Sequence, residues 1–484
     1  MTAKGSASSR TAILGIEGFV ACVAGLLCWF GVSWAIRSPQ VLVMDELGNL
    51  TRFLTDTYGH IFTFLPAAIY NDRPTGFILE RVLYDRFGFN YTPQLCCFLT
   101  IHFSNCALAF LLLRRLGLER VLALASVGVF GVLSTTAQTA TYLGAVFDVL
   151  GAFFVLTSTL AFLSEWRGAK ALSAVLFFFA MRTKEFAIVL PMLFVVLTAM
   201  EMPLKPAGQF LGEAIRRLWA ILLVWIIFVA RYLSFVPSHH VSPDNPYLMH
   251  FDPATILTSF AYYGALVFGL ENTMLGKSAT IAAVALLSVL AYGITRRRIG
   301  LVFCVMAFVL LVLPVGTMPG QRSPYYAYAP QIFLLGATAF FLQDLTWWAV
   351  HSPSRRMMVT ACLGLAMLGW GAWFRGSVYF VSRMYFSQTL REESTKSVED
   401  VARVLPRVAP GSHVYVNSGS HTPWLFVAGP CAYYAVLIRD RAVSCFLGKP
   451  EAELRTLYAA DTGPKYWLDY GEGGAITLGD PKTY

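Results

Sequence analysis

The chain has 484 residues, of which 56% are hydrophobic and only 13% are charged, and its formal net charge is +9. A soluble globular domain usually carries about a quarter charged residues, so this composition, with a mean hydropathy of +0.59, excludes an ordinary soluble protein. We predict an all-α polytopic membrane protein, in which the excess of Lys and Arg marks cytoplasmic loops and does not indicate a nucleic-acid partner.

Eleven apolar stretches follow one another along the chain, and we expect each of them to form a transmembrane helix. They are residues 12–36, 93–113, 121–138, 143–164, 169–182, 186–200, 217–236, 278–295, 299–318, 325–345 and 357–374. The first stretch is too long for the core of a signal peptide, so we expect it to be retained as a span.

Basic residues in the short loops set the expected sidedness of these spans. Five clusters should face the cytoplasm, namely Arg114-Arg115 with Arg120, Arg167 with Lys170, Arg216-Arg217, Arg296-Arg297-Arg298 and Arg355-Arg356. Alternating spans satisfy all five clusters only if a further apolar segment, 254–273, does not cross. We therefore predict an interfacial or re-entrant helix there on the outer side, a cytoplasmic N-terminus and an extracytoplasmic C-terminus.

The segment 37–92, which joins the first two spans, is far longer than a connector requires. It contains two stretches whose apolar residues have helical spacing, TRFLTDTYGHIFTFLPAAIY and PTGFILERVLYDRFG. Such stretches suit helices that lie in the membrane interface, and Pro74 is well placed to begin the second one. We predict a long first outer loop that carries interfacial helices.

The composition changes at about residue 386, where charged residues become more frequent and Pro, Gly and Ser punctuate the chain. Residues 391–407 have helical spacing, whereas HVYVN and KYWLDYG are typical of strands. We predict a transmembrane domain over 1–385 and a small extracytoplasmic α/β domain over 386–484. A disulfide between Cys431 and Cys445 is chemically allowed on that side, and the sequence does not decide whether it forms.

Asp45 and Glu46 form an acidic pair about ten residues after the first span. Ionisable groups beside the hydrocarbon layer are costly to keep there, and by default they mark a functional site. No basic residue adjoins the pair to neutralise it, and the expected sidedness places it on the outer face. We therefore interpret Asp45 and Glu46 as candidate catalytic residues.

Further polar residues are expected at the outer ends of later spans. They are Arg182, Lys184 and Glu185 between the fifth and sixth spans, Arg231 and His239-His240 at the end of the seventh, and Arg322, Tyr325 and Tyr326 before the tenth. Arg73 belongs to the long first loop. An ion-pair network that merely holds the helix ends together is the alternative to a shared site, and a solvated loop is the more common role for paired histidines.

The order of these signals resembles that of the GT-C class of membrane glycosyltransferases, and is most similar to the branch related to protein O-mannosyltransferases. The matching elements are Asp45-Glu46, Arg73-Pro74, a span with His102 and Asn105 that ends in LLLRRLG, the Lys-Glu of RTKEFAIVLP, and RSPYYAYAP. They fall within residues 12–345. No Trp-Trp-Asp string is present, which disfavours the oligosaccharide-transferring branch.

The resemblance implies transfer of one sugar, a hexose or a pentose, from a polyprenyl-phosphate carrier to a hydroxyl on the outer face, with inversion. Asp45 is then the expected general base, because a carboxylate can take the proton of the attacking hydroxyl, and Glu46 is its support or a metal ligand. The leaving phosphate needs fixed cations or a metal, so a divalent metal is one option and no cofactor is certain. The expected phosphate-binding residues are Lys184, Arg231 and Arg322, and the expected supporting residues are Glu185, Arg73, Tyr325, Tyr326 and His239.

The expected partners are the polyprenyl-phosphate-linked sugar, membrane lipids, and an acceptor that is a lipid, a glycan or a protein. We expect a bacterial inner-membrane protein whose active site faces away from the cytoplasm. A membrane transporter or lipid flippase is the main alternative function, although no internal repeat typical of transporters is visible. A polysaccharide polymerase is a closer rival, but its long outer loop usually lies later in the chain. Neither the sugar nor the acceptor leaves a mark in the sequence.

Overall fold

The computed structural model describes residues 7–37, 46, 49, 57–67, 72–88, 90–202, 207–235, 247–376, 392–397, 399–400, 403, 411–417, 444–446, 449–471, 473 and 475–479. Asp45, His239 and Cys431 fall outside these residues, so the roles predicted for Asp45 and His239 stay predictions and the disulfide that the sequence allows between Cys431 and Cys445 stays open.

Helices make up the membrane part of the chain, and each predicted span has a helix at its place. In chain order they are α1 (Ala7–Arg37), α5 (Tyr91–Arg115), α6 (Arg120–Val132), α7 (Ser134–Ala140), η1 (Leu143–Ala145), α8 (Val146–Phe162), α9 (Ala169–Met181), η2 (Glu185–Val189), α10 (Leu190–Glu201), α11 (Ala207–Leu233), α12 (Pro253–Val267), α13 (Met274–Lys277), α14 (Ala279–Thr295), α15 (Ile299–Gly316), η4 (Pro319–Gln321), η5 (Pro324–Ala327), α16 (Tyr328–Ala349) and α17 (Pro353–Gly376).

Fewer helices are long enough to span a membrane than the eleven apolar stretches of the sequence suggest. Among the described residues, six helices are long and apolar enough to span a membrane, or seven if α6 and α7, which meet at a bend of 63°, form one broken span. The helices α9 and α14 and the η2–α10 unit are apolar but shorter. The polytopic all-α membrane fold is confirmed, whereas the count of eleven spans stays a prediction.

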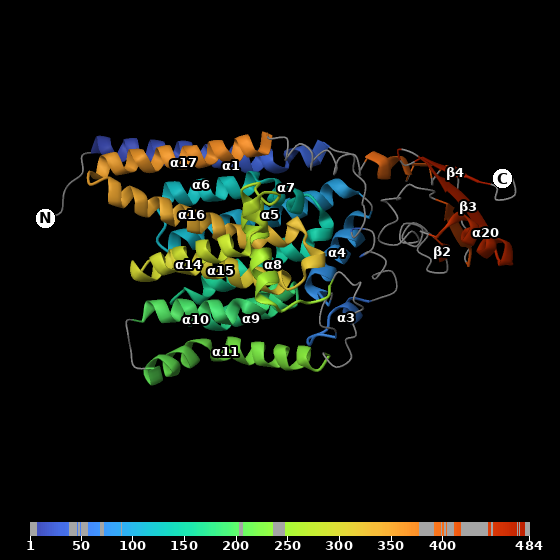
Figure 1. The fold of residues 1–484 in the computed structure, drawn as a ribbon, viewed down its shortest axis with the longest axis horizontal. Coiled ribbons are helices and arrows are strands. Elements are labelled where there is room, and N and C mark those ends of the chain that lie inside the picture. Colours follow the sequence, from blue (N-terminus) through green and yellow to red (C-terminus); the bar gives the residue numbers. More distant parts are fainter. Residues whose placement is uncertain are drawn as a thin grey trace.

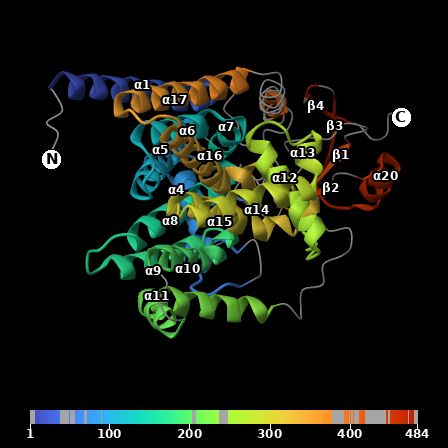
Figure 2. The same cartoon turned by 60° about the vertical axis from the view of Figure 1, so that its left-hand side comes forward.

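The long helices lie side by side as a bundle (Figure 1). In both views α1 and α17 lie together at one edge and α11 lies at the opposite edge (Figure 2). The helix α12, yellow-green in Figure 1, runs across the direction of its neighbours. Asp252 caps its N-terminus, because the Asp252 Oδ1 accepts a hydrogen bond from the Thr255 amide at 2.8 Å. That this segment does not span the bilayer stays a prediction.

Small residues allow α1 and α6 to approach closely. A Cβ added at Gly31 would overlap the carbonyl oxygen of Gly131, and one added at Gly131 would overlap the side chain of Cys28. In a membrane, where lipid tails are as apolar as Leu, such close backbone contact is a principal source of helix association. The Cys28 thiol also reaches the Val127 carbonyl oxygen at 3.5 Å across the same contact.

The first outer loop has one of its two predicted helices. The helix α4 (Pro74–Phe87) begins at Pro74 as expected, because proline fits the first helical position. In the other stretch the structure describes residues 57–67, which contain a single helical turn, α3 (Tyr58–Ile61), followed by non-helical residues. Pro66 disfavours helix in the residue before it, and the Thr63 carbonyl oxygen accepts a hydrogen bond from Arg182 instead of from a helical amide.

The tail contains the predicted strands in a four-stranded sheet of order β2-β1-β3-β4. The strands are β1 (His413–Asn417), β2 (Ser444–Phe446), β3 (Lys465–Tyr470) and β4 (Ile476–Leu478), and α20 (Glu451–Ala460) precedes β3. The strand β1 pairs in parallel with β2 and β3, whereas β4 is antiparallel to β3. Tyr415, Leu454 and Trp467 form a small core between sheet and helix, so this part of the tail has an α/β arrangement.

Replacement of Gly131 by Val tests the α1–α6 contact. We expect Gly131→Val to destabilise the purified protein by about 1–3 kcal/mol, the usual cost of overpacking, and to lower its unfolding temperature in detergent. Gly25→Val on the partner helix α1 is the control, because a Cβ at Gly25 meets no atom within 4 Å. Equal unfolding temperatures for the two variants would contradict the packing argument.

Candidate functional site

The turn between α9 and η2 carries charged side chains into the protein. The helix α9 ends at Met181, and the backbone of Lys184 is extended, with φ −155° and ψ 137°. Successive side chains of an extended segment point in opposite directions. Lys184 and Glu185 are therefore directed toward different helices, α8 and α4, although they are neighbours in sequence.

Lys184 forms a buried ion pair with Asp148, which lies in the first turn of α8. The Lys184 Nζ is 3.0 Å from the Asp148 Oδ2, and the two side chains are only 4% and 3% exposed. Burial and the nearby Arg73 cation lower the pKa of Lys184, and the Asp148 carboxylate opposes them. Among the described residues, the second oxygen of Asp148, Oδ1, has no hydrogen-bond partner.

Arg73 and Glu185 form a second ion pair beside the first. The Arg73 Nε donates to both carboxylate oxygens of Glu185, at 2.9 and 3.1 Å, and the guanidinium lies 5.1 Å from the centre of the Phe147 ring. Burial alone would lower the pKa of Arg73, but the Glu185 carboxylate outweighs burial and raises it. Two cations and two carboxylates thus gather where α4, α8 and η2 meet.

Arg182 belongs to the fold of this region. Its side chain is fully buried and donates to the Thr63 carbonyl oxygen at 3.0 Å, to the Thr63 Oγ1 at 2.7 Å and to the Asp72 carboxylate at 3.2 Å. These contacts fasten the first outer loop to the end of α9. Arg182 therefore stabilises the structure around the site, and the loop that it contacts covers its side chain.

Two adjacent cavities meet at the paired charges. The first, which we call the apolar cavity, has a volume of about 210 Å³ and its walls are mainly hydrophobic side chains such as Ile188, Val315 and Met318. The second, which we call the polar cavity, has a volume of about 160 Å³ and is lined in part by Asn49 and Asp148. The side chains that line both cavities are Arg73, Lys184, Tyr247 and Tyr326.

The tyrosines of η5 cover the cation of Lys184. The Lys184 Nζ lies 4.7 Å from the centre of the Tyr326 ring and 6.0 Å from that of Tyr325. The two rings contact each other edge to face at 4.8 Å. Cations are attracted to aromatic faces, so the rings of η5 help to stabilise the Lys184 charge.

A buried polar network connects α8 to the residue that follows η5, Tyr328. The Tyr328 hydroxyl lies 2.8 Å from the His102 Nδ1 and accepts a hydrogen bond from the Asn105 Nδ2 at 3.2 Å. The same Asn105 amide donates to the carbonyl oxygen of Val149 at 2.8 Å. Because Val149 adjoins Asp148 and Tyr328 follows the Tyr325-Tyr326 turn, the network links two walls of the polar cavity.

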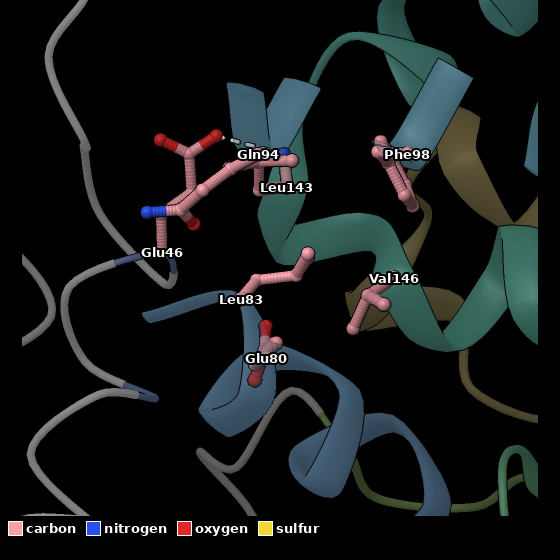
Figure 3. A pocket seen from close by; sticks show the side chains of 7 residues that line it. All are labelled: Glu46, Glu80, Leu83, Gln94, Phe98, Leu143 and Val146. Atoms are coloured by element: carbon pink, nitrogen blue, oxygen red, sulfur yellow. Dashed lines mark hydrogen bonds between the residues drawn. The ribbon is translucent and has the colours of Figure 1, made fainter. Parts of the chain in front are cut away.

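Glu46 lies buried next to the polar cavity, in a separate small pocket (Figure 3). Its Oε1 accepts a hydrogen bond from the Leu143 amide at 2.8 Å, at the start of η1, and Figure 3 shows this carboxylate directed away from Glu80. Glu80 in turn accepts a hydrogen bond from Asn49 at 2.9 Å. Since Gly144 follows Leu143 and lines the polar cavity, η1 separates Glu46 from that cavity by one turn of chain.

The other two predicted phosphate-binding residues lie outside both cavities. The Arg231 Nε donates to the Pro66 carbonyl oxygen at 2.9 Å, which joins α11 to the first outer loop. The Arg322 Nη2 lies 3.4 Å from the Ser259 Oγ, and its guanidinium lies 5.5 Å from the Tyr262 ring of α12. The structure therefore brings together Lys184, Glu185, Arg73, Tyr325 and Tyr326, and leaves Arg231 and Arg322 apart.

Sequence reasoning overlooked Asp148 and Tyr247. Asp148 offered a signal, because an acid within an apolar stretch is rare and usually functional. Tyr247 offered no such signal, because the sequence of the long connection before α12 has no pattern that places this tyrosine at the cavities. Glu80, which lines the small pocket together with Glu46, was overlooked because α4 has the appearance of an ordinary interfacial helix.

A metal site is not evident in the part of the chain that the structure describes. No group of three or more His, Cys, Asp and Glu side chains converges there in a way that could hold a metal ion. The proposed metal-ligand role of Glu46 therefore stays a prediction.

Removal of one partner of the buried ion pair should destabilise the protein strongly. We expect Lys184→Met to cost about 3–5 kcal/mol, because it leaves the Asp148 carboxylate buried and uncompensated. The double variant Lys184→Met/Asp148→Asn should recover most of this loss, as measured by thermal unfolding in detergent. Exposed Lys277 provides the control Lys277→Met, which should have little effect. A double variant as unstable as Lys184→Met alone would refute the electrostatic explanation.

No protein-family model matches this chain, and no curated protein matches its sequence. The chain does align in three dimensions with the crystal structure of ArnT from Cupriavidus metallidurans in the apo state. The TM-score is 0.53 and the sequence identity 13%, over 96% of this chain and 94% of ArnT. At this identity the similarity establishes the fold alone. The chain is an integral membrane protein that shares the polytopic helical fold of ArnT.

Proposed function

We propose that this protein is a membrane glycosyltransferase that moves a single sugar from a polyprenyl-phosphate carrier to an acceptor hydroxyl. The observation that carries the proposal is the position of Lys184 and Arg73 at the junction of an apolar and a polar cavity. A lipid-linked sugar has the same three parts in the same order, namely an apolar chain, a phosphate and a polar ring. The shared fold with ArnT supports this interpretation.

The two cavities suit the two ends of such a donor. The apolar cavity offers hydrophobic walls to the first isoprene units of the carrier. The polar cavity, at about 160 Å³, is well below the ~300–1,000 Å³ of pockets for drug-sized ligands. Its size favours one sugar over an oligosaccharide. The Oδ1 of Asp148 and the amide of Asn49 are groups that a sugar hydroxyl can bind.

Lys184 and Arg73 are the residues that we assign to the donor phosphate. Their charges are balanced by Asp148 and Glu185, so the protein can bury them before the donor arrives. Arg73 contacts Glu185 through Nε, and its planar fork offers further donors suited to phosphate oxygens. As the bond from the sugar to the phosphate breaks, these fixed cations stabilise the charge that develops on the phosphate.

Asp45 is the residue that we assign as general base, with Glu46 in support. The acceptor oxygen attacks the anomeric carbon, its proton passes to the Asp45 carboxylate, and the bond between the anomeric carbon and the phosphate oxygen breaks with its electron pair on the phosphate. A single displacement of this kind inverts the anomeric configuration. The supporting observation is the position of the adjacent Glu46, which is held at η1 beside the polar cavity.

The acceptor that we propose is a lipid, glycan or protein hydroxyl on the extracytoplasmic side of a bacterial inner membrane. The side follows from the basic loops at the opposite end of the bundle. The fold does not distinguish the O-mannosyltransferase-like branch from the rest of the class, so neither the sugar nor the acceptor is assigned. A transporter would place its charges near the middle of the membrane, whereas these lie beside α4, at one end of the helices (Figure 1).

Replacement of Asp45 tests the base assignment. We expect Asp45→Asn to reduce the rate of transfer by about 10²–10⁴-fold, the usual contribution of a general base, while expression and thermal unfolding stay unchanged. Glu46→Gln, next to it in sequence, is the comparison and should reduce the rate less. The measurement is transfer of radiolabelled sugar in membranes that contain a mixture of polyprenyl-linked donors. Near-normal turnover by Asp45→Asn would exclude the assignment.

Replacement of Arg73 tests the phosphate assignment. Charge-assisted hydrogen bonds are worth about 1.5–3 kcal/mol, so Arg73→Gln should raise the KM for the donor by about 10–100-fold and leave the KM for the acceptor nearly unchanged. The same substitution at Arg231 and at Arg322, which line neither cavity, should have a smaller effect on the donor. If Arg322→Gln alone raised the donor KM, the phosphate would lie near α12 and not between the cavities.

A further inference from the structure

A second concavity lies at the end of the bundle away from the proposed site. It has a volume of about 640 Å³ and is lined by residues at the ends of α5 and α8, the α8–α9 connection, and the starts of α9, α11 and α15. Figure 1 shows these helix ends at the left of the view, whereas α3, α4 and the sheet of the tail lie at the right. We call this concavity the basic hollow.

Positive charge is concentrated in the basic hollow. The cations that line it are Arg115, Arg167, Lys170, Arg216 and Arg217, and the one carboxylate in the lining is Glu165. The lining thus carries five positive charges against one negative charge, a formal excess of four. Glu213 offsets part of this excess, because it forms ion pairs with Arg216 and Arg217. The remaining charge still favours an anion strongly.

The preference for Lys and Arg in cytoplasmic loops explains the presence of these residues but not their convergence. Arg296 and Arg355 come from the same class of loop and do not line the hollow. Two of the lining cations are also fixed in direction. The Arg115 Nη2 donates to the Leu163 carbonyl oxygen at 3.0 Å, and the Lys170 Nζ donates to the Phe162 carbonyl oxygen.

Apolar surface beside the hollow indicates a lipid and not a soluble anion. The first turns of α11, which contribute Arg216 and Arg217 to the hollow, expose Leu211, Ile215 and Trp219. Half or more of each of these three side chains is exposed. On an integral membrane protein such a stripe faces acyl chains. Trp166 at the rim is 57% exposed, and tryptophan is typical of the level of lipid headgroups.

We propose that the basic hollow binds the phosphate headgroup of an anionic membrane phospholipid, whose acyl chains lie along the exposed stripe of α11. Basic pockets between membrane helices on the cytoplasmic side are suited to such headgroups. The lipid would occupy a site at the opposite end of the bundle from the sugar donor. This inference does not depend on the proposed glycosyl transfer.

Lipid binding by the purified full-length chain in detergent tests the proposal. Native mass spectrometry would count bound phosphatidylglycerol, with phosphatidylcholine of the same acyl chains as the neutral comparison and inorganic phosphate as a soluble competitor. The test variant is Arg167→Gln/Arg216→Gln, in which both residues are exposed and line the hollow. The control variant, Arg296→Gln/Arg355→Gln, removes two exposed charges from the same end of the protein outside the hollow.

We expect the wild-type protein and the control variant to bind phosphatidylglycerol more tightly than phosphatidylcholine. The test variant should bind phosphatidylglycerol about 30-fold more weakly, since each basic residue near the headgroup contributes about 1 kcal/mol and a tenfold change corresponds to about 1.4 kcal/mol. Equal losses in the two double variants would overturn the proposal. It would also be overturned by equal binding of phosphatidylcholine, or by displacement of the lipid by inorganic phosphate, which would indicate a site for a soluble anion.

Discussion

The ion pair between Lys184 and Asp148 is the interaction on which the arrangement of the site depends. Neither charge can remain buried alone, because the desolvation of an isolated ion costs several kcal/mol even after relaxation. The requirement that each charge meet its partner positions the α9–η2 turn against the first turn of α8. Arg73 and Glu185 add a second pair from α4, so three segments that are distant in sequence are held to one place.

The surroundings of these pairs limit how they can move. Tyr326 covers the Lys184 ammonium, and the Tyr328 hydroxyl links the start of α16, directly after η5, through Asn105 to the backbone of α8. Arg182 fastens the first outer loop over the end of α9. Preorganised charges of this kind need no rearrangement when negative charge develops on a bound phosphate. The same contacts that stabilise the fold therefore prepare the site for the chemistry that we propose.

The two ends of the bundle differ in how their charged side chains are arranged. At the end beside α4, cations are buried and paired with carboxylates, which suits a ligand that must be held between an apolar and a polar space. At the other end, cations line an open hollow with few acids. The first arrangement gives selectivity at the cost of burying ions, whereas the second attracts anions from the membrane surface. Two cations face two carboxylates at the first end, whereas five cations and one carboxylate line the hollow, so both the bases and the acids create this asymmetry.

The sequence by itself determined the membrane class, the places of the helices, the α/β character of the tail and five of the residues that gather at the site. Hydrophobic length and the scarcity of charge are local properties, so Tyr91–Arg115 and Ile299–Gly316 are recognisable as spans without a fold. Only the tertiary structure decided which charges meet. Lys184 meets Asp148 and Glu185 meets Arg73 because extended backbone sends neighbouring side chains to different helices. In the sequence, Arg231 and Arg322 had the same features as Lys184, namely basic residues at expected outer ends of spans. In the structure they contact Pro66 and Ser259 and line neither cavity. The direction of a side chain depends on the packing of helices that are far apart in the chain, and the sequence does not show this packing.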